Sequence, residues 1–168
     1  MDKLKIACAI FLMLFNKTPP TSGPPTSGLT QEKKMSKYLE RAKEIRAIVE
    51  PHHNCTQSVL MSFTQSLNLD DETAFKLAVA FGGGMKSGIT CGVITGGLMV
   101  LGLFDVDDPA TTQKLVKDFQ GRHGDMLNCA DLLRVNAANG GQRKPHCDAL
   151  VYEMVEYVEK ILKERGKL

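Results

Sequence analysis

The sequence contains no tryptophan, and aromatic residues make up only 6% of its 168 residues. Aromatic platforms on which the bases of single-stranded nucleic acids stack are therefore not expected. The net charge of +2 is small and no run of lysine and arginine occurs, so the electrostatic footprint of a nucleic-acid-binding protein is missing as well. We expect no nucleic-acid partner.

Long apolar runs are also missing, which bears on membrane insertion. The run Ile6–Phe15 is about half as long as a membrane-spanning helix needs to be. It follows Lys3 and Lys5 and is similar to the apolar core of a signal peptide. The repeated Pro-Pro-Thr-Ser-Gly that comes next is typical of a linker.

Residues 1–34 are thus interpreted as an apolar leader-like segment with a Pro/Thr/Ser/Gly linker, and residues 35–168 as the folded domain. Three origins stay open for the first segment: a leader, a membrane-surface anchor, or an artefact at the start of the gene. A cytoplasmic location is favoured, with membrane association or export through the apolar segment as the alternative. Cys8 lies inside this segment and is excluded from the candidate site.

No stretch of the domain alternates apolar and polar residues as a half-buried strand does, so helices are predicted throughout. Their expected ranges are 33–49, 55–67, 70–81, 91–104, 109–123, 128–133 and 145–164. The segment 91–104 carries no charge and is predicted to be a buried central helix. Gly96 and Gly97 would let another backbone pass closely there. The predicted fold class is all-α, a compact helical bundle.

The five cysteines form none of the common short motifs. Without Cys-x-x-Cys, a thioredoxin-type site and a zinc ribbon are disfavoured, and without Cys-x-x-Cys-His there is no attachment site for c-type haem. The ferredoxin spacings are missing too. An odd number of cysteines in a domain with an ordinary apolar content does not indicate a secreted disulfide scaffold.

The four cysteines of the domain share one feature, because each falls near the start of a predicted helix. They are Cys55, Cys91, Cys129 and Cys147. The residues before the first three are predicted N-caps, and Pro145 opens the helix of the fourth. A helix N-terminus lowers the pKa of a thiol, and the thiolate is the form that attacks disulfides and binds metals. Packing as small apolar side chains stays open as the alternative.

Cys91 is the candidate for a reactive thiol, because it opens the most buried helix after a glycine-rich loop. The helix N-terminus should lower the pKa of its thiol, whereas burial should raise it. We predict that the first effect is the larger in the reduced, metal-free protein. Cys91 should then alkylate at pH 7 faster than an unperturbed thiol.

The glycine-rich loop at residues 82–88 suggests two roles. Its end is similar to that of a P-loop, but Ala80 and Met85 stand where that motif needs glycine, so phosphate binding is disfavoured. We expect instead that its backbone comes close to a bound group or to Cys91. The candidate cofactor-binding positions are Gly83, Gly84 and Gly92.

Histidines flank two of the cysteines in sequence. His52 and His53 precede Cys55, and His146 precedes Cys147. They could serve as ligands or bases, but exposed loop positions are the favoured interpretation. His123 is interpreted as a helix-end residue. The carboxylates form no evident acid–base pair, so no catalytic residue is assigned.

The segment from Asn54 to Leu162 resembles a prokaryotic family of four-cysteine redox proteins, named for one Cys, a Cys-Gly-Ala-x-x-Gly motif and two further Cys. The matching pieces are Asn54–Leu60, Phe81–Met85, Thr90–Gly96, Asn128–Leu133 and Cys147. Val93 replaces the Ala of the motif and leaves all four thiols in place.

The resemblance implies a redox-active protein, described for the family without a defined reaction. A similar domain of split-Soret-type cytochromes is associated with an iron–sulfur centre. The resemblance therefore implies an iron–sulfur cluster on the four cysteines that passes electrons to a redox partner protein. One alternative is a thiol–disulfide protein in which pairs such as Cys55 and Cys91 cycle, and another is a structural zinc site in a helical interaction module. An oxidoreductase component and a homodimer also stay open.

Overall fold

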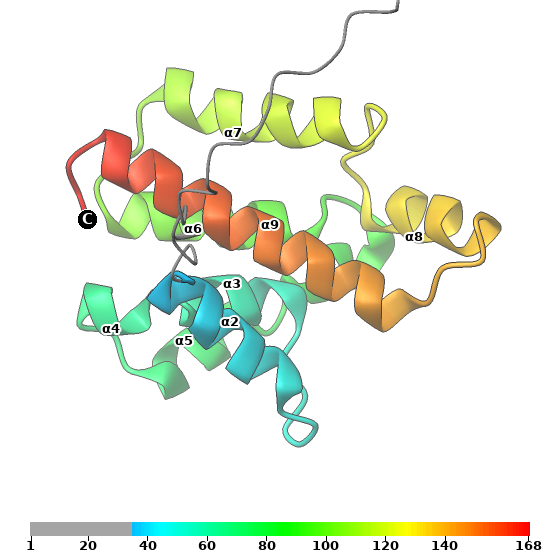
Figure 1. Ribbon diagram of the computed structural model, residues 1–168, viewed down its shortest axis with the longest axis horizontal. Coiled ribbons are helices and arrows are strands. Elements are labelled where there is room, and N and C mark those ends of the chain that lie inside the picture. The colour runs from blue at the N-terminus through cyan, green and yellow to red at the C-terminus, as the bar shows by residue number, and fades with distance from the viewer. Residues whose placement is uncertain (1–34) are drawn as a thin grey trace, which may run out of the picture. The chain divides into compact units, whose positions relative to one another are not determined.

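The computed structural model describes residues 35–168, and this part of the chain folds into helices, which confirms the all-α class (Figure 1). The elements are α2 (Lys37–Ala47), α3 (Cys55–Met61), α4 (Thr64–Leu67), α5 (Asp71–Ala78), the turn η1 (Gly84–Gly88), α6 (Gly92–Leu103), α7 (Pro109–Arg122), α8 (Cys129–Ala138) and α9 (Arg143–Glu164). Within this range, none of the helices combines the length and apolar content that a membrane span requires. The predictions for residues 1–34, including Cys8, lie outside the described residues.

The uncharged helix α6 lies at the centre, as predicted, with α3, α7 and α9 packed around it (Figure 1). Its two adjacent glycines face different neighbours. A Cβ atom at Gly96 would lie 2.9 Å from the Cβ atom of Val59 on α3, and one at Gly97 would lie 2.8 Å from the sulfur of Met154 on α9. The predicted close approach is therefore confirmed on both sides of α6, and it brings α3 and α9 near one another.

The long helix α9 connects most of the bundle, because it contacts α2, α3, α6 and α8. Its buried apolar side chains form one face of the core: Leu150, Val151, Met154, Val155, Val158, Ile161 and Leu162. Near its start, Asp148 accepts a hydrogen bond of 2.6 Å from Nε of Arg46 on α2. This ion pair is largely buried and fixes the first turns of α9 against the end of α2.

Several predicted boundaries are wrong. The expected helix 55–67 breaks after Met61, because Phe63 turns into the core and stacks on Tyr38 with ring centroids 4.5 Å apart. Helix α5 ends at Ala78, whereas the sequence predicts an end at Phe81. The helix at Cys129 is longer than expected and reaches Ala138.

The last helix begins earlier than its proline suggests. It starts at Arg143, so Pro145 is the third helical residue instead of the first. Proline is tolerated there because the first N–H groups of a helix have no acceptor within the helix. Cys147 is consequently the fifth residue of α9, and the prediction that it lies in the first turn is wrong.

Candidate functional site

A single antiparallel bridge between Thr90 and Asn128 brings two of the four cysteines together. The backbone N–H of Cys91 donates to the carbonyl of Leu127 at 2.8 Å, and that of Cys129 donates to the carbonyl of Ile89 at 2.8 Å. Cys91 itself is the N-cap of α6, which corrects the expectation that Thr90 has this role. Cys91 and Cys129 act as a thiol pair, because each is the largest influence on the pKa of the other.

Cys55 reaches the same place because α3 starts against the start of α6. Asn54 caps α3 by accepting from the N–H of Gln57 at 3.0 Å, and the Gln57 side chain accepts from the N–H of Asn54 at 2.8 Å. The hydroxyl of Thr56 donates to the carbonyl of Gly92 at 2.9 Å. A Cβ atom at Gly92 would lie only 2.5 Å from the sulfur of Cys55. Glycine at this position therefore makes room for the thiol.

Cys147 completes the group from α9. All four cysteines line one small cavity of about 10 Å³, and the other lining side chains are Val93, Leu132, Leu133, His146 and Leu150. Negative charge on Cys55 or Cys129 raises the pKa of Cys91, and the same two residues raise the pKa of Cys147. We call these four residues, which line the same cavity, the cysteine ring. None of the four is in a disulfide.

The two thiols of the Cys91–Cys129 pair have opposite acidities. The pKa of Cys129 is lowered to about 6, chiefly because the thiol of Cys91 donates a hydrogen bond to its sulfur and secondarily because of the charge on Arg143. The pKa of Cys91 is raised, because ionisation would break this hydrogen bond and because its side chain is buried. The prediction that Cys91 is the reactive thiol is therefore wrong, and Cys129 is the more acidic of the pair.

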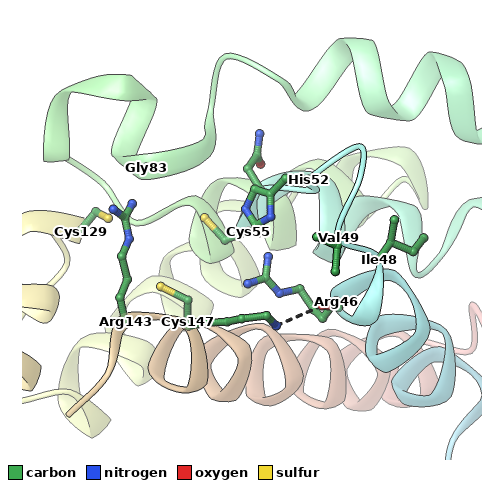
Figure 2. Close-up of a pocket in the computed structure, with 11 residues that line it drawn as sticks. Arg46, Ile48, Val49, His52, Cys55, Gly83, Cys129, Arg143 and Cys147 are labelled. Carbon is green, nitrogen blue, oxygen red and sulfur yellow. Dashed lines mark hydrogen bonds between the residues drawn. The ribbon is translucent and has the colours of Figure 1, made fainter.

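A larger cavity of about 650 Å³ opens beside the ring (Figure 2). Cys55, Cys129 and Cys147 line it, whereas Cys91 does not. Figure 2 shows that the guanidinium groups of Arg46 and Arg143 point into the same region as these three sulfurs. The remaining lining residues are Ile48, Val49, His52, Asn54, Gly83 and Lys144. Three of the four thiols thus adjoin a basic space that is large enough for a small molecule.

The glycine-rich loop, which we expect to approach a bound group or Cys91, packs against Cys129. A Cβ atom at Gly84 would lie 2.4 Å from the carbonyl oxygen of Ile89 and 2.9 Å from the Cβ atom of Cys129. Gly84 also has a φ of 63°, a backbone conformation that favours glycine. Gly83 lines the larger cavity. The loop therefore shapes the space around Cys129.

The histidines take different positions. His53 is buried, which corrects the expectation of an exposed loop residue: its ring packs edge-on against Phe75, and its carbonyl accepts from Arg46 Nη1 at 2.6 Å. His52 is exposed and lines the larger cavity. His146 lines the small one, and burial lowers its pKa. His123 caps the end of α7 and contacts Glu153 at 3.0 Å, as its interpretation as a helix-end residue implies.

A comparison with models of protein families shows to which family the chain belongs. A family model described as "Putative redox-active protein (C_GCAxxG_C_C)" matches residues 53–161, which is more than half of the chain and includes all four cysteines of the ring. The chain belongs to this family. Its motif, as the description spells it, is Gly-Cys-Ala-x-x-Gly, so the expectation that Val93 replaces the Ala is wrong, and Gly92 stands at that position after Cys91. No curated protein and no solved structure matches it. The chain is thus a member of a family that is described as redox-active.

Sequence reasoning missed the residues that surround the thiols. The Asn-x-x-Gln spacing of Asn54 and Gln57 is a capping-box pattern and could have predicted how α3 begins. By contrast, Arg46 and Arg143 carry no local motif. Arg46 also precedes the segment that matches the C_GCAxxG_C_C family. Only the folded structure places both guanidinium groups beside the cysteines.

Proposed function

We propose that the protein is a redox protein whose four cysteines hold an iron–sulfur cluster for electron transfer. The observation that carries this proposal is the ring of Cys55, Cys91, Cys129 and Cys147 around one shared cavity. A thiol–disulfide exchange needs only two cysteines and would leave the convergence of the other two without a role. Four thiolates are the ligand set of the common iron–sulfur clusters.

The donor set fits such a cluster in its chemistry and number. In residues 35–168, however, no three His, Cys, Asp or Glu side chains are spaced to hold a metal ion, and the shared cavity measures about 10 Å³. Binding would therefore require the thiols to rotate outward. The adjoining larger cavity provides the space on the side of Cys55, Cys129 and Cys147.

The surrounding residues suit an anionic centre. A bound cluster would supply one-electron chemistry, and with four thiolate ligands it is negatively charged. Arg143 acts electrostatically on Cys129 and Cys147, and Arg46 acts on Cys147. Both cations favour the deprotonated thiols that metal binding requires. The leucines and Val93 around the small cavity give the sulfurs an apolar cover on that side.

Anaerobic reconstitution with ferrous iron and sulfide tests the proposal. After desalting, the reduced protein should retain iron and acid-labile sulfide and absorb visible light. Single Cys→Ser variants at the four ring positions should each lose or strongly weaken this absorption. Cys8→Ser is the matched control and should retain it. A colourless protein that binds only zinc, or equal effects of Cys8→Ser and Cys91→Ser, would contradict the proposal.

The proximity of Cys91 and Cys129 favours a second candidate, a thiol–disulfide pair. Cys129, with its lowered pKa, would attack a partner disulfide, forming a mixed disulfide and releasing one partner thiol. Cys91 would then lose its proton and attack the sulfur of Cys129, forming the Cys91–Cys129 disulfide and releasing the second thiol. Mass spectrometry after mild oxidation distinguishes the candidates, because this one requires a Cys91–Cys129 disulfide in protein that takes up no iron.

A further inference from the structure

The larger cavity beside the cysteines has a basic lining. Three cationic side chains line it, Arg46, Arg143 and Lys144, and no carboxylate does. Ile48 and Val49 add an apolar part to the lining, on the side away from Arg143 (Figure 2). Its volume of about 650 Å³ falls within the usual range for small-molecule sites. The lining therefore suits a small anion that also has an apolar part.

The three cations are not equivalent, because two of them share Asp148 as an ion-pair partner. It accepts from Arg46 Nε at 2.6 Å and from Lys144 Nζ at 2.8 Å. Arg143 has no ion-pair partner within residues 35–168, although its charge reaches Cys129 and Cys147. Arg143 is therefore the cation that is available to a ligand, and a group bound to it would lie next to two thiols.

The guanidinium group of Arg143 extends from the first residue of α9 toward Cys129 and Gly83 (Figure 2). A guanidinium group can bind a carboxylate or phosphate through two hydrogen bonds. Arg143 can therefore hold an oxyanion inside the cavity, next to Cys129.

We infer that this cavity binds a small molecule with a carboxylate or similar oxyanion group, held by Arg143 within reach of Cys129. The inference deepens the proposed function, because it names the class of molecule that reaches the redox centre. Only that role rests on the proposed function. The binding itself does not require a cluster, so it can be tested on reduced, metal-free protein.

Two alkylating agents of nearly equal size but different charge provide the test. Iodoacetate is anionic and iodoacetamide is neutral, and with each the thiolate forms an S–C bond while iodide leaves. The rate ratio of iodoacetate to iodoacetamide at Cys129 is measured by peptide mass spectrometry. Because both reagents need the same thiolate, the ratio cancels any change in the pKa of Cys129 and reports on anion recognition alone.

Arg143→Gln should lower this ratio by about two- to fivefold, the range expected when one partly exposed cation is removed. Arg134→Gln is the matched control, because Arg134 is an exposed arginine on α8 that does not line the cavity, and its ratio should match the wild type. Arg143 is exposed at a helix start, so both variants should keep the wild-type melting temperature. An unchanged ratio in Arg143→Gln overturns the inference.

Competition in the wild-type protein provides an independent measurement. Succinate should slow the alkylation of Cys129 by iodoacetamide more than sodium chloride does at equal ionic strength, and Arg143→Gln should abolish this difference. Equal effects of succinate and chloride in the wild type overturn the inference. A protein that fails to bind iron can still pass both tests, so failure of the proposed function is distinguishable from failure of this inference.

Discussion

Replacing Gly92 with alanine tests the packing on which the four-cysteine site depends. The added Cβ atom would lie 2.5 Å from the sulfur of Cys55, 2.5 Å from Oγ1 of Thr56 and 3.2 Å from the carbonyl oxygen of Phe81. Non-bonded carbon atoms are most stable about 3.5–4.0 Å apart, so the first two contacts are each too short by about 1 Å. Either α3 must move away from α6, or Cys55 must rotate out of the ring.

The expected cost follows from two opposing effects. Forcing one extra methyl group into a packed interior costs about 1–3 kcal/mol. Removing a helical glycine gains at most about 1 kcal/mol, and less at the first position of a helix, where Gly92 lies. Gly92→Ala should therefore lower the free energy of unfolding by about 1–2 kcal/mol, as the difference between these effects. It should also reduce iron binding.

Gly102→Ala is the control for this experiment. Gly102 lies on the same helix, and a Cβ atom there would meet nothing within 4 Å. This variant should be as stable as the wild type or more stable by up to about 1 kcal/mol. Urea denaturation followed by circular dichroism gives both values. If Gly92→Ala is as stable as Gly102→Ala, the close approach of Cys55 to α6 is refuted.

Three further predictions concern the thiols, a buried ion pair and the N-terminal segment. In reduced, metal-free protein, alkylation of Cys129 should reach half its maximal rate near pH 6, and Cys91→Ala should move this midpoint to higher pH because it removes the hydrogen-bond donor; an unmoved midpoint would contradict the assigned cause. Arg46→Ala should lower the free energy of unfolding by about 1–3 kcal/mol in urea denaturation, because Asp148 loses its arginine but keeps its ion pair with Lys144, and the carbonyl of His53 loses a donor; a loss below about 0.5 kcal/mol would show that the pair contributes little. Removing residues 1–34 should leave the melting temperature of the domain unchanged, because chain termini usually carry few core contacts; a fall of several degrees would contradict this.

The pH dependence of stability has a defined sign for Cys129. Its pKa is lowered in the folded protein, so between pH 6 and the pKa of the unfolded thiol only the unfolded chain keeps the proton. The contribution of Cys129 to the free energy of unfolding therefore rises with pH across this window and is lost as the pH falls through about 6. Cys91, whose pKa is raised, works in the opposite direction above the pKa of its unfolded thiol.

Much of the fold could be predicted from local patterns. The uncharged segment before Phe104 indicated the central helix, and Gly96 and Gly97 indicated close packing on it, which the structure confirms. The break after Met61 could not be predicted, because it depends on the fit of Phe63 against Tyr38 in the folded core. The apolar spacing of residues 55–67 fits one continuous helix as well as it fits a helix that breaks after Met61.

The site was predictable in its members but not in its geometry. The motif around Cys91 and the position of all four cysteines near predicted helix starts indicated that they act as a set. The approach of Cys91 to Cys129, by contrast, depends on the long-range bridge between Thr90 and Asn128. The acidity of Cys91 was predicted with the wrong sign, because a helix start predicts a low pKa and gives no sign of the neighbouring Cys129. For the same reason, no sequence pattern indicated Arg143 as the cation beside two thiols.

Metal and sulfide analysis of protein purified without oxygen tests the central claim most directly. The account predicts iron and acid-labile sulfide in the isolated protein, with visible absorption that disappears on chelation and oxidation. The thiols of Cys55, Cys91, Cys129 and Cys147 should be protected from alkylation until the metal is removed. Colourless protein that contains neither iron nor sulfide and whose Cys129 alkylates freely would contradict the iron–sulfur assignment.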